Sequence, residues 1–242
     1  MKKLLFVLSM AALFSCETVA QKTTDITFKA DKLIEVALLS VKEGKETQLN
    51  GEYFPKVMPV AQPYGAKPIA TFAVTRKVIS DKPVQMVVFF EWDNLEQKRA
   101  FERNPEYLKL KNIRDDALQF LSQGYFKVDE DVTYSLSAEG TYDFAALWID
   151  PANAPKLQEY FEAVFPEAQK PKFGYTPIAS LHPVEGVYDQ NYHPSIIAFA
   201  EWKTGSSAVD KFQKTKVYKE NVAKREAATP YKDVWHLKPI LN

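Results

Sequence analysis

The chain has 242 residues, of which 46% are hydrophobic and 26% charged, and its formal net charge is zero. This balance is that of an ordinary folded protein, and it argues against the strong electrostatic attraction that brings basic proteins to nucleic acid or to anionic membrane surfaces. The single cysteine excludes an internal disulfide framework, so we expect stability to come from hydrophobic cores.

The first sixteen residues have the pattern of an export signal. Lys2 and Lys3 precede an apolar run over residues 4–14, which is too short to cross a bilayer as a helix. Cys16 follows this run in a context that resembles a bacterial lipidation site, so we expect a lipid on Cys16 after cleavage. This predicts a protein anchored in the periplasm or at the outer membrane. The alternative is a soluble secreted protein cleaved after Ala20.

The rest of the chain repeats itself. Residues 52–62 return loosely as residues 159–169, and Phe-Phe-Glu-Trp at 89–92 returns as Phe-Ala-Glu-Trp at 199–202. Two copies of roughly 100 residues are two small domains, since a solenoid needs shorter and more numerous units. After the signal segment 1–16 we expect a tether over 17–31, a first domain over 32–128, a linker over 129–141 and a second domain over 142–242.

The elements of the first repeat alternate between strand and helix patterns. The apolar run at 34–41 predicts a buried strand. Apolar residues spaced by four and three predict a helix over 45–64, bent by its prolines. Further elements are expected in this order: strands at 70–79 and 84–92, helical segments at 94–103 and 106–121, a helix cap at Gly124 and a strand at 125–128.

The second repeat shows the same order of elements. Its expected strands are 142–149, 176–184, 195–202 and 234–237, and its expected helices are 153–169 and 206–227. The order β-α-β-β-α-β is that of a ferredoxin-like fold, so the predicted fold class is α+β with two tandem ferredoxin-like repeats. Helices on one face of each sheet leave the other face bare. We therefore expect the repeats to pair sheet to sheet as an intramolecular α/β barrel.

The first repeat also resembles a known family. The segments 36–45, 90–92 and 104–115 look like the dimeric α/β-barrel superfamily, near an uncharacterised branch beside the antibiotic-biosynthesis monooxygenase and NIPSNAP-like domains. Members of this superfamily usually pair two copies into a closed barrel, so the resemblance implies an intramolecular pseudo-dimer. Relatives that bind haem use a helical histidine that is not found at the matching place, and we predict no cofactor.

The candidate catalytic residues come from the strand ends. Glu91 and Glu201 each precede a tryptophan, and alternation along a strand puts the two side chains on opposite faces. Glutamates inside the barrel could act as bases with raised pKa values. The alternative is that they pair with arginines of the last helix of each repeat. The candidate pocket residues are Trp92, Trp148, Trp202, Arg114 and Arg225.

Histidine offers one further candidate. His182, in an expected strand, could serve as a pocket acid or base, but a structural role is the alternative. The three histidines lack the spacing of a metal triad, so no metal site is predicted. The sequence also lacks a nucleophile elbow, a phosphate loop and a dinucleotide fingerprint.

Three functions remain open from the sequence. The favoured one is an exported, lipid-anchored barrel protein that binds a small apolar or aromatic ligand. The second is a cofactor-independent monooxygenase or isomerase acting on an aromatic or quinone-like compound, with His182 or a barrel glutamate as base. The third is a structural or assembly lipoprotein whose barrel is filled with side chains.

Overall fold

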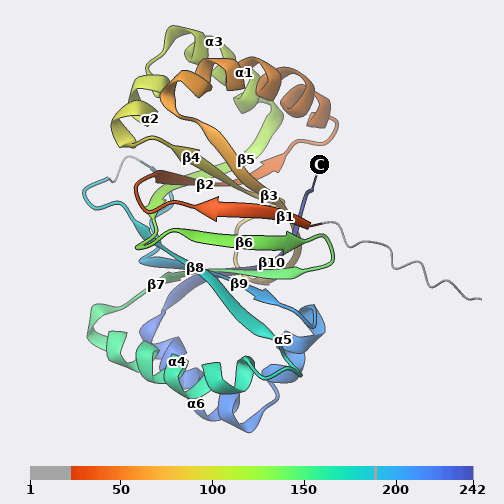
Figure 1. The fold of residues 1–242 in the computed structure, drawn as a ribbon, viewed down its shortest axis with the longest axis vertical. Helices are drawn as coiled ribbons and strands as arrows, with labels where there is room; N and C mark the ends of the chain where they lie inside the picture. Colours follow the sequence, from red (N-terminus) through yellow and green to blue (C-terminus); the bar gives the residue numbers. More distant parts are fainter. Residues whose placement is uncertain (1–22, 188–189, 242) are drawn as a thin grey trace, which may run out of the picture.

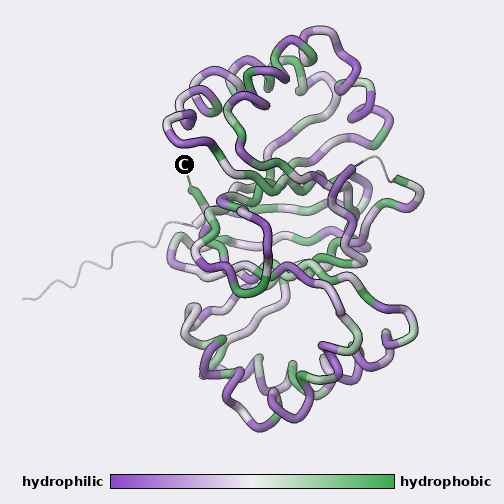
Figure 2. Tube along the Cα trace, turned by 180° about the vertical axis from the view of Figure 1, so that it is seen from behind, coloured by the Kyte–Doolittle hydropathy of each residue, from purple (hydrophilic) through white to green (hydrophobic). Residues whose placement is uncertain are grey.

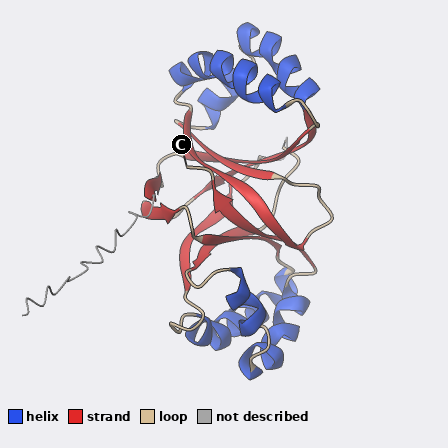
Figure 3. Cartoon of the chain, turned by 90° about the vertical axis from the view of Figure 1, so that its right-hand side faces the viewer, coloured by secondary structure: helices blue, strands red, loops and turns tan. Residues whose placement is uncertain are grey.

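The computed structural model describes residues 23–187 and 190–241. Within these residues, eight antiparallel strands close into a barrel in the order β10-β3-β4-β2-β5-β8-β9-β7. The helices form two groups on opposite sides of the barrel (Figures 1 and 3). The predicted α+β class, with a large antiparallel sheet of the ferredoxin-like kind, is confirmed. The predicted signal segment and Cys16 lie outside the described residues.

The first half contributes four neighbouring strands, in the order β3-β4-β2-β5, and one helical layer. Strand β2 is buried along its whole length, because one face lies in the barrel and the other under the helices. This explains its uninterrupted apolar sequence. The elements are β2 (Leu33–Val41), η1 (Gln48–Tyr53), α1 (Phe54–Ala61), η2 (Gln62–Tyr64), β3 (Lys67–Ile79), β4 (Met86–Trp92), α2 (Leu95–Glu102), α3 (Pro105–Ala117) and β5 (Leu118–Lys127).

The second half contributes the strands β8-β9-β7-β10. The barrel closes where β10 pairs with β3 and where β5 pairs with β8, so each seam joins one half to the other. The elements are β7 (Thr141–Trp148), η3 (Pro151–Asn153), α4 (Ala154–Ala168), β8 (Tyr175–Pro183), β9 (Ile196–Trp202), α5 (Ser206–Phe212), α6 (Lys216–Ala228) and β10 (Tyr231–Pro239).

Aromatic side chains fill the interior of the barrel. The ring centroids of Phe72 and Phe199 are 5.3 Å apart, and those of Phe89 and Phe199 are 5.6 Å apart. Figure 2 shows hydrophobic segments gathered on the strands between the two helical layers. The largest side chains of this core are Phe28, Phe72, Phe89, Phe126, Tyr142, Phe144, Phe199 and Trp235. A ligand site must therefore be sought outside the barrel interior.

Parts of the expected tether and linker are ordered instead as a two-stranded sheet. Strand β1 (Thr23–Phe28) pairs antiparallel with β6 (Val132–Ser137), beside the barrel (Figure 1). Phe28 and Leu136 are almost fully buried, and the ring of Phe28 lies 5.5 Å from that of Phe89. Alternating positions of each strand thus fix it against the core: Ile26 and Phe28 in β1, and Val132, Tyr134 and Leu136 in β6.

Gly124 was expected to end a helix, but it lies inside β5. The helix α3 ends at Ala117, and the strand begins seven residues earlier than expected. A Cβ atom on Gly124 would lie 2.2 Å from the backbone oxygen of Tyr192. The glycine is therefore required by the close approach of another main chain and not by a helix end.

Candidate functional site

Each half encloses a cavity between the outer face of its strands and its helices. The cavity of the first half measures about 70 Å³ and that of the second half about 390 Å³. The register of the strands shows which residues of the two cavities are equivalent. Leu33 on β2 pairs with Trp92, and Thr141 on β7 pairs with Trp202 in the same way. Counting two residues along each strand, Glu35 of β2 corresponds to Asp143 of β7.

The two cavities share a frame of tyrosine and arginine. In the first half, Nη1 of Arg114 donates a hydrogen bond of 3.1 Å to the hydroxyl of Tyr107. In the second, Nη2 of Arg225 donates one of 3.2 Å to the hydroxyl of Tyr218. The guanidinium of Arg225 also lies 5.6 Å from the ring centroid of Tyr160. The arginines sit seven residues after their tyrosine partners, on the last helix of each half, so the duplicated helix carries the duplicated contact.

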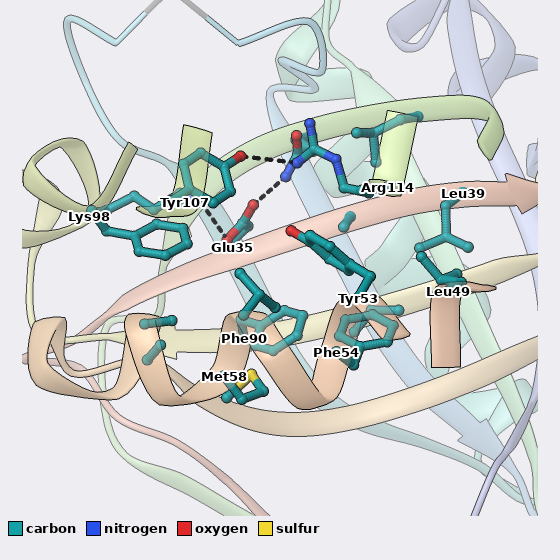
Figure 4. A pocket seen from close by; sticks show the side chains of 18 of the residues that line it. Glu35, Leu39, Leu49, Tyr53, Phe54, Met58, Phe90, Lys98, Tyr107 and Arg114 are labelled. Atoms are coloured by element: carbon teal, nitrogen blue, oxygen red, sulfur yellow. Dashed lines mark hydrogen bonds and ion pairs between the residues drawn. The ribbon is translucent and has the colours of Figure 1, made fainter. Parts of the chain in front are cut away.

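The carboxylate of the first half is fully engaged. Glu35 accepts hydrogen bonds from Nε1 of Trp92 at 2.8 Å and from the side-chain amide of Gln123, and its Oε2 lies 3.0 Å from Nζ of Lys98. Figure 4 shows Glu35 and Lys98 together at one end of this cavity, with Phe90 near α1. The cation and the two hydrogen-bond donors compensate this carboxylate for the loss of water on burial.

In the second half, the equivalent carboxylate has one oxygen without a hydrogen-bond partner in the described part of the chain. Among the described residues, Oδ1 of Asp143, Nε1 of Trp202 and both ring nitrogens of His236 are buried and have no hydrogen-bond partner. Oδ1 of Asp143 and Nε2 of His236 are 4.0 Å apart, beyond hydrogen-bond distance. A buried polar atom without a partner costs about 1–3 kcal/mol. Several of them at one cavity leave hydrogen-bonding capacity that ordered water or a ligand can use.

Substitutions between the halves explain why Asp143 lacks partners. Gln123 stands opposite Ala37 on β2, whereas the equivalent position opposite Ala145 on β7 is Val234. Lys98 precedes a buried phenylalanine by three residues, and the residue in that place in the second half is Val209. The donor amide and the cation are both replaced by valine.

Smaller side chains also account for the larger volume. Glu35 pairs with Phe90 across the strands, whereas Asp143 pairs with Ala200. Two residues earlier, Val88 of the first half corresponds to Ala198 of the second. The aromatic ring that occupies the first cavity is therefore missing from the second, which leaves space of the size that small molecules use.

Burial shifts the pKa values of Asp143 and His236 in opposite directions, and each shift favours the neutral form of the side chain. It raises the pKa of Asp143 to about 6, opposed in part by the nearby indole of Trp202 and the charge of Arg225. It lowers the pKa of His236 to about 4, with a further lowering by Arg76. At neutral pH the cavity therefore presents a carboxylate and an uncharged imidazole.

The first half supplies one wall of the second cavity. Strand β3 runs past the end of its own sheet along β10, and Val78 and Ile79 line the cavity there. Arg76 of β3 forms a two-pronged ion pair with Asp210 of α5, with N–O distances of 3.1 and 2.9 Å. The cavity thus depends on the seam between the halves.

Four of the five predicted pocket residues line these cavities. Trp92 and Arg114 line the first, and Trp202 and Arg225 line the second. The fifth, Trp148, lies near the end of the barrel, where its ring packs against Tyr192 and Tyr231 at 5.5 and 4.6 Å.

The predicted glutamates lie on the other face of the sheet. Trp92 and Trp202 pack under the helices, so strand alternation turns Glu91 and Glu201 toward the barrel. Glu201 accepts a hydrogen bond from the hydroxyl of Tyr134. The expected pairing with arginine is wrong, because Arg114 and Arg225 instead bond the acidic residues that follow them, Asp115 and Glu226.

His182 lies on β8 with its side chain 42% exposed, 3.5 Å from Asp129. It is not among the residues that line the described cavities, so the structure does not support it as an enclosed base. The three histidines of the chain lie on β8, in the loop before β9 and on β10. None of them lies on a helix.

Sequence reasoning missed Asp143 and His236. The available signal was the repeat itself, because aligning the two first strands places a carboxylate, Glu35 or Asp143, at the same position of two otherwise apolar runs. A charged residue in a buried strand is expensive and needs a reason. His236 gave no such signal, because its counterpart is Tyr125.

Within the described ranges, no cluster of three or more metal-ligating side chains is present. The same residues contain no helix that is long and apolar enough to cross a membrane.

Comparison with known proteins identifies the fold. Residues 36–122 match a family model described as a domain of unknown function (DUF1330), which covers about a third of the chain. No curated protein matches the sequence. Among solved structures, an anthrone oxidase-like protein has a TM-score of 0.53 at 12% identity, over 88% of this chain and 94% of that one.

Two further structures give similar values. A protein described as a candidate monooxygenase from Fusobacterium nucleatum has a TM-score of 0.51 at 13% identity, over 88% of this chain and 94% of that one. A variant of chlorite dismutase from Candidatus Nitrospira defluvii has a TM-score of 0.50 at 10% identity, over 87% and 92%. At this identity the likeness establishes the α/β-barrel fold and not an activity.

Proposed function

We propose that this protein binds one small, largely apolar or aromatic ligand in the cavity of its second half. The observation that carries the proposal is the contrast between the two halves. Glu35 is bonded to Trp92, Lys98 and Gln123, whereas Oδ1 of Asp143 faces a cavity of about 390 Å³ without a partner among the described residues. Binding would supply the missing hydrogen bonds.

The lining of the cavity defines the chemistry of the ligand. Asp143 would accept a hydrogen bond from a ligand hydroxyl or amine, and the indole N–H of Trp202 would donate one to a ligand oxygen. Around them, flat rings favour a planar ligand through edge and face contacts. The aromatic residues of the lining are Tyr160, Phe161, Phe165, Tyr175, Trp202, Phe212 and Tyr218.

Titration calorimetry with 2-naphthol, a planar compound with one hydroxyl, tests this proposal. We expect one site per chain, and we expect Asp143→Asn to weaken binding by about tenfold or more through loss of a charged acceptor. The matched control is Glu201→Gln, because Glu201 lies on the barrel side of β9. Equal loss in both variants, or no binding to the folded wild-type protein, would contradict the proposal.

A second candidate function is cofactor-independent oxidation of such a ligand. The pKa of Asp143, raised to about 6, is close to that of a useful base at neutral pH, and Asp143 lines the cavity. Asp143 would take a proton from an activated ring carbon, and the resulting carbanion would add O2. Loss of water from the peroxide would leave a carbonyl on that carbon, so that anthrone and O2 would give anthraquinone and water.

Oxygen consumption with anthrone tests this candidate, since one solved relative of the fold is described as anthrone oxidase-like. We expect consumption that rises with an apparent pKa near 6 and that is lost in Asp143→Asn. Binding without any oxygen consumption above the solvent rate would leave the protein as a binding protein only.

We further propose that the chain is exported and held on a membrane through a lipid on Cys16, and that its two repeats act as an intramolecular pseudo-dimer. The sequence before residue 23 supports the first part, and the equivalence of Glu35 with Asp143 supports the second. Metabolic labelling with palmitate in a bacterial host tests the anchor. Label on the wild-type protein and none on Cys16→Ser is the expected result.

A further inference from the structure

We infer that the ligand of the second-half cavity carries a hydrocarbon tail, which lies in a groove along α4. The inference rests on the proposed function and names its ligand class, an amphiphile with a hydroxyaromatic head and an alkyl chain. It follows from the position of the groove, from the residues that separate it from the cavity and from the placement of polar groups.

The groove is lined mostly by residues of α4 and measures about 560 Å³. Its floor is apolar and includes Ile149, Ala154 and Leu157. Polar side chains such as Gln158 and Glu162 complete its lining. An open apolar channel of this kind fits a flexible chain better than a rigid ring, because the chain can follow the helix.

Two phenylalanines belong to both the groove and the cavity. Phe161 and Phe165, one turn apart on α4, line each of them, so these rings form a wall that the two spaces share. The ring centroids of Phe161 and Phe165 are 4.8 Å apart, and Phe165 stacks on Tyr175 at 5.6 Å. In our inference, movement of these half-buried rings joins the cavity to the groove.

The helix is weakened at this point. Pro166 follows Phe165 inside α4 and has no N–H to donate to the carbonyl of Glu162. The turn that carries Phe165 is therefore held by fewer main-chain bonds than the rest of the helix, which favours movement of that ring.

The buried polar side-chain atoms that lack a partner among the described residues of this region belong to the cavity and not to the groove. Asp143 and His236 come from β7 and β10, beneath the helices, whereas the groove floor is apolar. An amphiphile would place its hydroxyl against Asp143, its ring between the aromatic walls and its tail past Phe165 into the groove.

The test is a calorimetric series of 4-alkylphenols from methyl to octyl, with the full mature chain. For the wild-type protein we expect affinity to rise about two- to fourfold for each methylene that enters the groove, at a stoichiometry of one. Ala154→Glu places a charge in the groove, in the first turn of α4, where a carboxylate suits the helix dipole. We expect this variant to lose most of the gain from chain length.

The control is Ala163→Glu, which adds the same charge to the same helix at a position outside the lining of both spaces. It should keep the wild-type dependence on chain length. The affinity for 4-methylphenol reports separately whether the cavity is intact.

Two results would overturn the inference while leaving the proposed function in place. One is a wild-type affinity that does not change from methyl to octyl, and the other is the same gain per methylene in Ala154→Glu as in the control. If the folded wild-type protein bound neither 4-alkylphenols nor 2-naphthol, this result would contradict both the proposed function and the tail site.

Discussion

Oδ1 of Asp143 lies 4.0 Å from Nε2 of His236, and neither atom bonds to another described residue. The same burial acts on both groups, raising the pKa of Asp143 to about 6 and lowering that of His236 to about 4. Folding alone gains nothing from this arrangement. It is understandable as a site kept ready for a ligand at the expense of stability.

The stability of Asp143→Asn should depend on pH differently from that of the wild-type protein. Because the pKa of Asp143 rises from 3.8 to about 6 on folding, the wild-type protein loses stability as pH rises through this range. The full loss above pH 6 corresponds to about 3 kcal/mol. Urea unfolding should therefore show the variant gaining up to this amount over wild type between pH 4 and 7.5.

His236 titrates in both proteins and does not disturb the comparison. Its pKa falls from 6.5 to about 4 on folding, so its contribution is present above pH 6.5 and is lost as pH falls toward 4 in either chain. A difference between Asp143→Asn and wild type that stays constant with pH would contradict the raised pKa of Asp143.

Filling the second cavity should abolish binding without unfolding the protein. Ala200→Phe reproduces the phenylalanine that occupies the equivalent position 90 of the first half. Ala200 is buried on the same face of β9 as the lining residues Ala198 and Trp202, so we expect the larger side chain to push into the cavity, to cost about 1–3 kcal/mol of unfolding free energy and to abolish 2-naphthol binding by calorimetry.

The matched control opens the other cavity. Phe90→Ala should cost about 2–4 kcal/mol, as large-to-small substitutions do, and should leave 2-naphthol binding in the second half unchanged. Retained binding in Ala200→Phe would place the ligand elsewhere.

Removing one partner of the buried ion pair of the first half should destabilise the protein more than removing both partners. Lys98 and Glu35 are each 4% exposed in the side chain and 3.0 Å apart. Lys98→Met leaves a buried carboxylate without its cation, which costs about 3–5 kcal/mol in urea unfolding. Combining it with Glu35→Gln should recover most of the loss.

An exposed ion pair provides the comparison. Lys45 and Asp116 are 41% and 59% exposed and 3.0 Å apart, and Lys45→Met should change the free energy of unfolding by about 1 kcal/mol or less. An equally small effect of Lys98→Met would show that water reaches Glu35.

Gly124→Ala should destabilise the barrel because the new methyl group would lie 2.2 Å from the backbone oxygen of Tyr192. Backbone must move to relieve this contact, so we expect a loss of about 2–3 kcal/mol in thermal or urea unfolding. Gly51→Ala is the control, since its methyl group would meet only a side-chain carbon at 3.6 Å. It should be neutral or slightly stabilising.

The local sequence pattern was sufficient to predict the type of most elements. It failed where contacts between distant parts of the chain determine the secondary structure. The apolar run of β2 and the repeated Phe-x-Glu-Trp strand ends predicted strands that are present. The order of the elements predicted the α+β class. The segment after Ala117 was expected to stay helical, but it enters the sheet, because β2 and β8 bond to it from distant parts of the chain.

The candidate site was predictable only in part. Trp202 and Arg225 were found because they repeat, and both line the second cavity. Glu201 was chosen because a glutamate inside the barrel could act as a base; alternation places it on the barrel side, but that interior is filled with aromatic side chains. The location of the cavity was missed because the sequence does not show whether the barrel interior is open. Many side chains from both halves fill it together, and this leaves the space under the helices as the cavity.

The sequence by itself determined the internal similarity of its two halves, the type of most elements and the tyrosine, tryptophan and arginine positions that occur in both halves, because these depend on local pattern and on comparison of one half with the other. Only the tertiary structure decided which half has an open cavity. That outcome depends on Ala200 replacing Phe90 and on Val209 replacing Lys98, changes that look conservative or incidental in the sequence. Their effect arises because packing and hydrogen bonding are settled between strands and helices that are distant in the chain.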